Sequence, residues 1–407
     1  MHTLTKSIPT VQSADAGETA KETEKVLKAL AAAAFLVFFS GFMVAPLIPS
    51  LSREFSATPR QMGWVVPAYM LPYGFSTLFY GPLSDRLGRK RVLLALVVLA
   101  IFTTLLISTA WSTASLITMR IIAGQCAGGI VTIGLAAVGD LYPYARLGRA
   151  MGWMFGAIAG GMAFGATLGA WLNPILGWRK EFLLLGAANA VVLVLLFRHR
   201  HVLGNPANER RAGITDILLG YASLLKNPRG AKVYSFILLN GIFHGGVFSW
   251  LGFLLTQRYH LSDDGIGKAL LGYGIPGMFL GPILGRLADR FGRGKIIPAG
   301  FFLATACAIA LAPVSPLWIV TVAVTALSVG LDMTHPLMAG IVAALDPKRR
   351  GQAMGLNAFA LFTGLGLGAV IFQWLLAQGF AATLLDFAAL QFVLGALSVR
   401  VFRSERV

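Results

Sequence analysis

The sequence is short of charge, of acidic residues above all, and of cysteine. Only 13% of its 407 residues are charged, whereas a soluble protein has roughly 25%. A chain of this length with so little polar surface cannot cover two or three water-soluble domains, which excludes the classes of soluble enzyme. The two cysteines, Cys126 and Cys307, both lie inside apolar runs, so a disulfide framework is not indicated.

Motifs that hold nucleotides or metals are absent as well. The sequence contains no G-x-x-x-x-G-K-[ST] run, no H-E-x-x-H and no cluster of Cys and His. We therefore expect no enzyme activity, no cofactor and no metal site. If the chain moves a solute against its concentration gradient, the energy must come from the gradient of an ion or of another solute.

Long apolar runs fill the sequence instead. Hydrophobic residues make up 56% of the chain, and 47 glycines fit closely packed transmembrane helices. At about 20 residues per crossing, we expect twelve spans, and the continuous apolarity excludes a membrane β-barrel. The expected limits are 28–50, 62–83, 92–111, 115–141, 148–174, 182–199, 233–257, 264–286, 295–315, 317–343, 352–376 and 381–402.

The longest polar interruption, at 200–232, divides the spans six and six. We therefore expect an N-terminal six-helix bundle over 28–199, a cytoplasmic central loop over 200–232 and a C-terminal six-helix bundle over 233–402. Residues 1–27 are polar and lack the apolar core of a signal peptide, which predicts a retained cytoplasmic tail. Residues 403–407 form a second short tail.

The basic residues predict the orientation of the chain. With the N-terminus inside, twenty-seven of the 34 Lys and Arg residues fall in inner segments, six fall in outer loops, and Arg120 lies within a span. This distribution predicts that both termini are cytoplasmic. It also explains the net charge of +17 without a nucleic-acid partner. Short outer loops without Asn-x-Ser/Thr sites favour the cytoplasmic (inner) membrane of a bacterium.

The two halves repeat one another. The run Gly81-Pro82-Leu83-Ser84-Asp85-Arg86-Leu87-Gly88-Arg89-Lys90 returns as Gly285-Arg286-Leu287-Ala288-Asp289-Arg290-Phe291-Gly292-Arg293-Gly294, at an offset of 204 residues. The same offset relates Tyr69 to Tyr273 and Pro72 to Pro276. An internal duplication whose halves share one orientation implies a pseudo-two-fold axis along the membrane normal.

The run from Gly81 to Lys90 resembles the G-x-L-x-D-R-x-G-R-K loop of the major facilitator superfamily. Arg120, followed by Gly124 and Gly128, is similar to the intramembrane arginine motif of that family, and Gly177-Trp178-Arg179 with Phe182 resembles a further signature. The likeness covers the chain from span one to span twelve and is nearest to the drug:proton antiporter branch. It implies an all-α fold of two pseudo-symmetric six-helix bundles that act as a monomer to move a small solute by alternating access.

Charged residues in this loop predict a conformational latch. Its acids can pair with the arginines in one state and release them in another. The alternative for Arg89, Lys90 and Arg91 is simple anchoring at the lipid headgroups. The expected latch residues are Gly81, Asp85, Arg86, Gly88, Arg89, Lys90, Asp140, Asp289 and Arg290.

Few ionisable residues lie within the spans, and such groups are usually functional because they are costly in the bilayer. Asp332 and His335 are three residues apart and share one helix face. We expect Asp332, assisted by His335 and less strongly by His244, to take up and release a coupling proton. The alternative is that Asp332 pairs with His335 or a span-seven residue only to hold helices together.

Two departures from the family pattern bear on direction and substrate. Span one has no acid, so Arg120 either bonds to backbone carbonyls and Gln125 or binds an anionic group of the solute. In span five, Gly161, Gly165 and Gly169 are four apart on one helix face, but the run Gly165-Ala166-Thr167-Leu168-Gly169-Ala170 lacks the proline and the last glycine of the antiporter pattern. Tight packing alone remains an alternative for these glycines.

An aromatic and methionine lining with few charges suits an amphipathic or apolar organic solute. The expected substrate-binding residues are Phe42, Met43, Tyr69, Tyr73, Arg120, Gln125, Asn240, Tyr273, Asn357 and Phe362. We expect a proton-coupled exporter of small organic or drug-like molecules. The alternatives are a proton-coupled importer of an organic anion, and a non-transporting receptor or assembly factor with a transporter fold.

Overall fold

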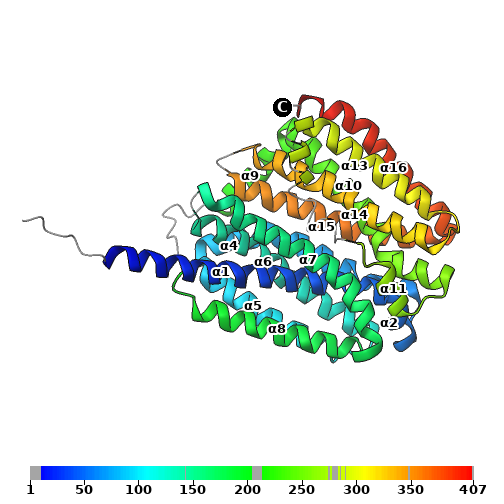
Figure 1. The fold of residues 1–407 in the computed structure, drawn as a ribbon, viewed down its shortest axis with the longest axis horizontal. Helices are drawn as coiled ribbons and strands as arrows, with labels where there is room; N and C mark the ends of the chain where they lie inside the picture. The colour runs from blue at the N-terminus through cyan, green and yellow to red at the C-terminus, as the bar shows by residue number, and fades with distance from the viewer. Residues whose placement is uncertain are drawn as a thin grey trace, which may run out of the picture.

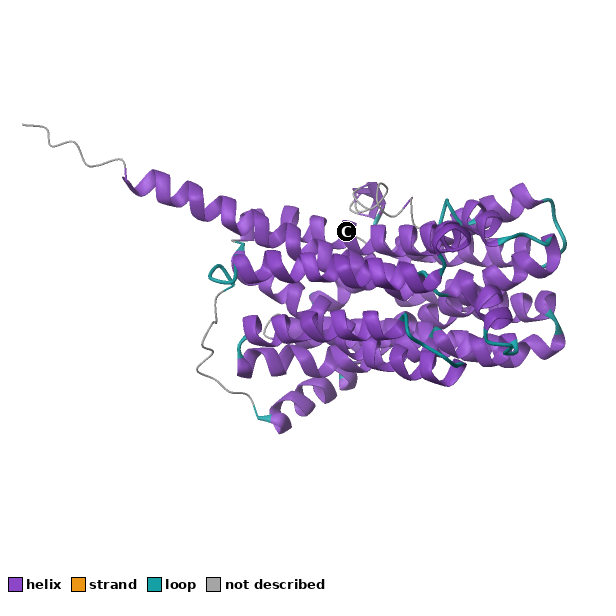
Figure 2. Ribbon diagram, turned by 90° about the horizontal axis from the view of Figure 1, so that it is seen from below, coloured by secondary structure: helices purple, strands orange, loops and turns teal. Residues whose placement is uncertain are grey.

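The computed structural model describes residues 11–142, 144–203, 213–273, 276, 283–284, 286–288, 290–346 and 349–405. These residues form helices joined by short turns, with no strand among them, and Figure 2 shows the long helices side by side with loops at the two ends. Ten helices of the described part are long and apolar enough to cross a membrane.

The helices of the first half are α1 (Val11–Phe42), α2 (Ile48–Glu54), α3 (Pro59–Met62), α4 (Pro67–Leu87), α5 (Arg89–Ile107), α6 (Thr113–Leu141), α7 (Tyr144–Leu176) and α8 (Trp178–Arg198). Those of the second half are α9 (Ile214–Lys226), α10 (Pro228–Tyr259), α11 (Asp263–Ala269), α13 (Arg293–Leu311), α14 (Leu317–Ala343), α15 (Arg350–Leu375) and α16 (Phe380–Val401). Apart from the first span, the expected spans that the structure describes in full are helices to within about five residues at each end.

The long helices gather into two bundles, one from each half of the chain (Figure 1). We call them the first bundle, which holds α1 to α8, and the second bundle, which holds α10 to α16. In the first bundle α1 packs along α7, and in the second α10 packs along α15 in the same way. The bundles meet through α4 against α15 and through α7 against α11.

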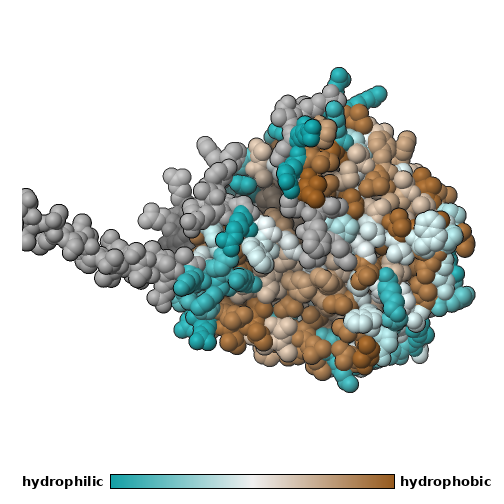
Figure 3. Space-filling model, in the orientation of Figure 1, coloured by the Kyte–Doolittle hydropathy of each residue, from teal (hydrophilic) through white to brown (hydrophobic). Residues whose placement is uncertain are grey.

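On the face seen in Figure 3, apolar side chains form a belt across the middle of the molecule, with polar side chains toward its two ends. Large apolar side chains such as Phe102 and Val194 are exposed along the belt, at 65% and 63%. Such a surface is stable only in lipid, so the chain is a multi-pass membrane protein. We call the end that carries the start of α1 and the end of α16 the terminal end, and the opposite end the distal end.

The first span is not one continuous helix. The helix α1 stops at Phe42, and a 3-10 turn over Ala45–Leu47 leads into α2. Pro46 and Pro49 lack the backbone N–H that a continuing helix needs at those positions. The segment therefore kinks near the distal end, where the sequence predicted an uninterrupted span over 28–50.

The expected central loop contains a helix of its own. The helix α9 lies within 200–232, and α10 begins at Pro228, five residues earlier than expected. The side-chain oxygen Oδ1 of Asn227 accepts the backbone N–H of Arg229 at 2.9 Å and so caps α10. Residues 204–212 lie outside the described part of the chain.

The duplication is visible in the backbone. Gly88, before α5, has φ +93°, and Gly292, before α13, has φ +86°. Both adopt a conformation that favours glycine, and they stand 204 residues apart, at the offset of the sequence repeat. The two halves thus turn between corresponding helices in the same way.

Candidate functional site

A layer of buried aromatic side chains lies between the two bundles. The rings of Phe42 and Phe248 have centroids 5.1 Å apart, and those of Tyr73 and Phe362 are 4.0 Å apart, each pair joining one bundle to the other. Phe248 also stacks on Tyr273 at 4.6 Å. We call this set the aromatic layer, and its members are Phe38, Phe42, Tyr69, Tyr73, Phe248, Tyr273 and Phe362.

The layer brings together five of the expected substrate-binding residues. Its other two members, Phe38 and Phe248, escaped prediction because apolar residues of a span look alike in sequence whether they face lipid or the partner bundle. All seven are buried, at 6% exposure or less. A solute that passes between the bundles must part this layer.

Arg120 lies beside the layer and is fully buried. Its guanidinium donates to the carbonyl oxygens of Val65, Ser40 and Gly41 at 3.2, 2.8 and 3.3 Å, and it lies 4.3 Å from the centroid of the Tyr69 ring. The last turn of α1 and the 3-10 turn over Gly63–Val65 supply these carbonyls. The geometry agrees with the backbone-carbonyl alternative for Arg120.

Gln125 takes no part in this arrangement, and that detail of the expectation is wrong. Gln125 is exposed on α6, because five residues advance a helix by about 140° beyond full turns and place it on another face than Arg120. Met43 is fully buried as well, but it packs against Gly169 of α7, where an added Cβ would lie 2.8 Å from the Met43 Cβ.

The ionisable residues of the second bundle lie close to the aromatic layer. The Asp332 carboxylate is within electrostatic range of Tyr273, and among the described residues no hydrogen bond or ion pair to it is found. The expected alternative of an Asp332–His335 ion pair is therefore not what this conformation shows. The His335 ring nitrogen Nε2 instead lies 3.4 Å from Nδ2 of Asn357.

His244 is fully buried, and neither of its ring nitrogens has a hydrogen-bond partner within the described part. It lies within electrostatic range of His335. Asn240, one helical turn earlier, donates to Oγ1 of Thr334 at 2.9 Å and accepts from Gln391 at 3.0 Å. Asn240 therefore braces α10 against α14 and α16, whereas His244 keeps free hydrogen-bonding capacity.

Three of the residues predicted to form a latch are joined by ion pairs at the terminal end of the first bundle. Arg89, at the start of α5, lies 3.2 Å from the Asp85 carboxylate of α4 and 2.8 Å from that of Asp140 at the end of α6. One guanidinium thus joins three helices. Arg290 in the second half lies with its guanidinium carbon 5.4 Å from the Phe291 ring, and Asp289 falls outside the described residues.

A polar contact between the bundles closes the distal end, and no feature of the sequence predicted it. Asp263, the first residue of α11, accepts from Oγ of Ser50 at 2.6 and 2.5 Å and from Nδ2 of Asn173 at 2.6 Å. Arg53 lies 3.9 Å from the same carboxylate. We call Ser50, Asn173 and Asp263 the distal contact.

A second carboxyl lies behind the distal contact. Glu181, in the first turn of α8, is 3% exposed, and both of its carboxyl oxygens lack a hydrogen-bond partner among the described residues. It is within electrostatic range of Asp263. A buried and unpaired carboxyl is rare, and its place at the start of an amphipathic span gave no signal in the sequence.

The terminal half of α7 is open by comparison. A Cβ added at Gly152 or Gly156 would meet no atom within 4 Å, whereas one at Gly165 would lie 2.6 Å from the carbonyl oxygen of Phe39. The bundles are nevertheless joined at this end through α4, where Oγ1 of Thr77 donates to the carbonyl of Gly355 at 3.1 Å. The described conformation is thus sealed distally and looser at the terminal end of α7.

Known proteins share this sequence pattern and fold. A family model for the Major Facilitator Superfamily matches residues 30–369 and 252–407. The uncharacterized MFS-type transporter YceJ of Bacillus subtilis (strain 168) is 28% identical over 369 residues, which cover 88% of this chain and 92% of the relative.

Solved structures agree in fold at lower identity. The human organic anion transporter MFSD10 superposes with a TM-score of 0.72 at 19% identity, covering 92% of this chain and 99% of that one. A D-xylose-proton symporter gives 0.74 at 14% identity, with 92% and 96% covered. The chain therefore belongs to the major facilitator superfamily, and it is a membrane transporter of small solutes rather than an enzyme.

Proposed function

We propose that this transporter exports a small amphipathic or apolar organic solute in exchange for protons. The observation that carries the proposal is the unpaired Asp332 beside an aromatic layer that spans both bundles. The basic terminal end faces the cytoplasm, as the distribution of Lys and Arg favours. The chain acts as a monomer in a bacterial inner membrane.

The aromatic layer supports a solute of this kind. Its rings offer broad apolar faces, and its hydroxyl groups, on Tyr69, Tyr73 and Tyr273, give few fixed hydrogen bonds. Such a surface binds by shape and by apolar burial rather than by a dense polar network. A solute that replaces ring-to-ring contacts between the bundles separates them without exposing apolar surface to water.

Asp332 supplies the step that couples the solute to protons. A carboxylate in a dry interface without a counter-ion is unfavourable by several kcal/mol, so closure of the bundles around Asp332 favours its protonated form. Opening toward the cytoplasm admits water and allows the proton to leave. His335 is three residues further along α14, and His244 lies within electrostatic range of His335; we propose that these two rings assist the transfer of the proton.

The geometry gives less support to an importer that binds an organic anion through Arg120. The three carbonyl oxygens already accept from the guanidinium, so an anion would have to displace these bonds. We therefore assign Arg120 to the structure of the first bundle. The same argument favours a neutral or cationic solute over an anionic one.

The test begins with a thermal-stability screen of the purified protein against a metabolite and drug panel, because a ligand stabilises the state that it binds. The best ligand is then followed in proteoliposomes under an imposed pH gradient, with a fluorescent dye for proton movement. We expect counter-movement of solute and protons in the wild type, and its loss in Asp332→Asn with the thermal stability retained.

The matched control is Asp386→Asn, which removes another carboxylate of the second bundle, one that is exposed and bonded to Gln378. It should transport like the wild type. Proton-driven transport by Asp332→Asn at the wild-type rate would contradict the coupling role. Solute and protons moving in the same direction would contradict export and favour import.

A further inference from the structure

A groove on the lipid-facing side of the first bundle stands apart from the path between the bundles. It lies between α5 and α8, has a volume of about 1310 Å³, and is lined mostly by aliphatic and aromatic side chains. Figure 1 places α5 and α8 on the side of the first bundle that faces away from the second. The groove therefore opens to lipid rather than to the aromatic layer.

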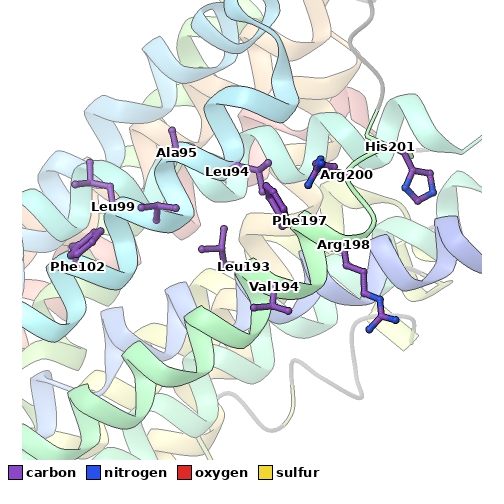
Figure 4. Close-up of a pocket in the computed structure, with 11 residues that line it drawn as sticks. Leu94, Ala95, Leu99, Phe102, Leu193, Val194, Phe197, Arg198, Arg200 and His201 are labelled. Atoms are coloured by element: carbon purple, nitrogen blue, oxygen red, sulfur yellow. The ribbon is translucent and has the colours of Figure 1, made fainter.

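The α5 wall of the groove is nearly as long as one leaflet of the hydrocarbon core is thick. On α5 the lining runs from Leu94 to Phe102, and on α8 from Leu193 to Phe197. Eight residues of helix rise about 12 Å, and one leaflet of the hydrocarbon core is about 15 Å thick. Figure 4 shows Leu99, Phe102 and Leu193 along this channel, and the small Ala95 also belongs to its lining.

The terminal end of the groove is basic. Its charged and titratable lining residues are Arg198, Arg200 and His201. The guanidinium of Arg200 lies 3.9 Å from the centroid of the Phe197 ring, over the end of the apolar walls (Figure 4). Among the described residues, Glu22 contacts this basic end: its carboxylate lies 3.8 Å from His201 and is already engaged by Lys25 and His199. The positive charge thus stands where a lipid headgroup meets the hydrocarbon region.

We propose that this groove is a binding site for one anionic phospholipid of the leaflet at the terminal end. One acyl chain occupies the channel between α5 and α8, and the phosphate and acidic headgroup contact Arg200, with Arg198 and His201 adding charge. Apolar walls alone would accept any lipid, but the basic end selects a negatively charged one.

The experiment is native mass spectrometry of the full-length protein with phosphatidylglycerol and phosphatidylcholine of identical chains. We expect the wild type to retain one phosphatidylglycerol in preference to phosphatidylcholine. Arg200→Ala should bind phosphatidylglycerol about fivefold more weakly, which corresponds to about 1 kcal/mol for one basic residue near the membrane surface. Arg400→Ala, which removes an exposed basic residue at the same end of α16, is the matched control and should bind normally.

A second set of variants changes the apolar walls of the groove and keeps its basic residues. Ala95→Trp fills the channel at an exposed position, so folding should persist while the bound phosphatidylglycerol is lost. Phe102→Ala removes an exposed wall and should reduce the bound fraction. Glycerol 3-phosphate, a headgroup without chains, should fail to compete.

Three results would overturn the site. Equal retention of phosphatidylglycerol and phosphatidylcholine would show that the groove only contacts bulk lipid and does not select an anionic one. If Ala95→Trp and Phe102→Ala both bind phosphatidylglycerol as the wild type does, the apolar channel takes no part in lipid binding. Full competition by glycerol 3-phosphate would show a phosphate site that needs no membrane lipid.

Discussion

At the scale of single residues, Arg120 illustrates how a buried charge is held without a counter-ion. Its partners are backbone carbonyls of α1 and of the 3-10 turn over Gly63–Val65, so it ties three segments of the first bundle together. Sequence reasoning could find the residue because a charge within a span is conspicuous. It could not identify the partners of Arg120, since every residue has a carbonyl, and these ones are free only because α1 ends at Phe42 and a 3-10 turn ends at Val65.

We predict that Arg120→Lys destabilises the protein without altering solute affinity. A single ammonium cannot reach three carbonyls in the planar arrangement of a guanidinium, and each lost charged hydrogen bond costs roughly 2 kcal/mol. The melting temperature should fall by several degrees, while the dissociation constant of the best ligand from the stability screen stays within about twofold. A large loss of affinity for anionic ligands at an unchanged melting temperature would show instead that Arg120 contacts the solute.

Glu181 is the opposite case, a buried acid with free hydrogen-bonding capacity. Replacing it by Gln keeps the shape and removes the possibility of an uncompensated charge. We predict that Glu181→Gln raises the unfolding free energy by about 1 kcal/mol or leaves it unchanged. Thermal unfolding in one detergent and buffer measures this. A clear fall in melting temperature would mean that Glu181 has a partner in the native membrane state.

At the scale of the elements, the ends of α4, α5 and α6 are joined by Arg89. The competing interpretation of this basic loop is anchoring at the headgroups, which would make neighbouring arginines equivalent. The two arginines have different surroundings: Arg89 is mostly buried between two carboxylates, whereas Arg91 is exposed. The predicted latch thus has a specific member that can be tested against its neighbour.

We predict that Arg89→Gln slows transport about fivefold while Arg91→Gln does not. The two ion pairs are partly exposed, so together they are worth about 1 kcal/mol, which is close to fivefold in the population of one conformation. Initial transport rates in proteoliposomes, normalised to the amount of protein, are the measurement. Equal slowing by both substitutions would support anchoring.

The helix α9 acts as a further tie at the terminal end. The hydroxyl of Tyr221 donates to the carbonyl of Leu78 in α4 at 2.9 Å, so a helix of the central segment holds the first bundle. Burial raises the pKa of Tyr221 to about 12, and the phenol therefore remains a donor at physiological pH. The helix was foreseeable from the spacing of Ile214, Ile217, Tyr221 and Leu224, but its charged surroundings led to the expectation of a loop.

At the scale of the whole molecule, the apolar runs were sufficient to predict the arrangement of helices. Bilayer thickness sets their length, so the limits of α14 were predicted to the residue, at 317 and 343. The contacts between the bundles were harder to predict from the sequence. Ser50 and Asp263 are 213 residues apart, and nothing local indicates that they meet. The aromatic layer was partly predicted because tyrosines within a span are conspicuous, whereas Phe38 and Phe248 are not.

We predict that joining the bundles at the distal contact stops transport. Cysteines at Ser50 and Asp263, linked by a short bifunctional reagent, should hold this end closed, and the two native cysteines are buried and should react slowly. Solute flux should fall to background after cross-linking and return when a cleavable linker is reduced. Each single cysteine variant, treated identically, is the control. Flux that persists in the linked protein would contradict alternating access at this contact.

The helix α7 has a tightly packed distal half and an open terminal half. The distal glycines Gly161, Gly165 and Gly169 lie against α1 and Met43 just after it, whereas a Cβ added at Gly152 or Gly156 would meet no atom within 4 Å. Because no gap remains in the distal half, sliding α7 along α1 would bring backbones into collision. We therefore expect closure at the terminal end to bend α7 near Gly161, and bulky residues introduced at Gly152 or Gly156 to bias the transporter toward the form that is open at the terminal end.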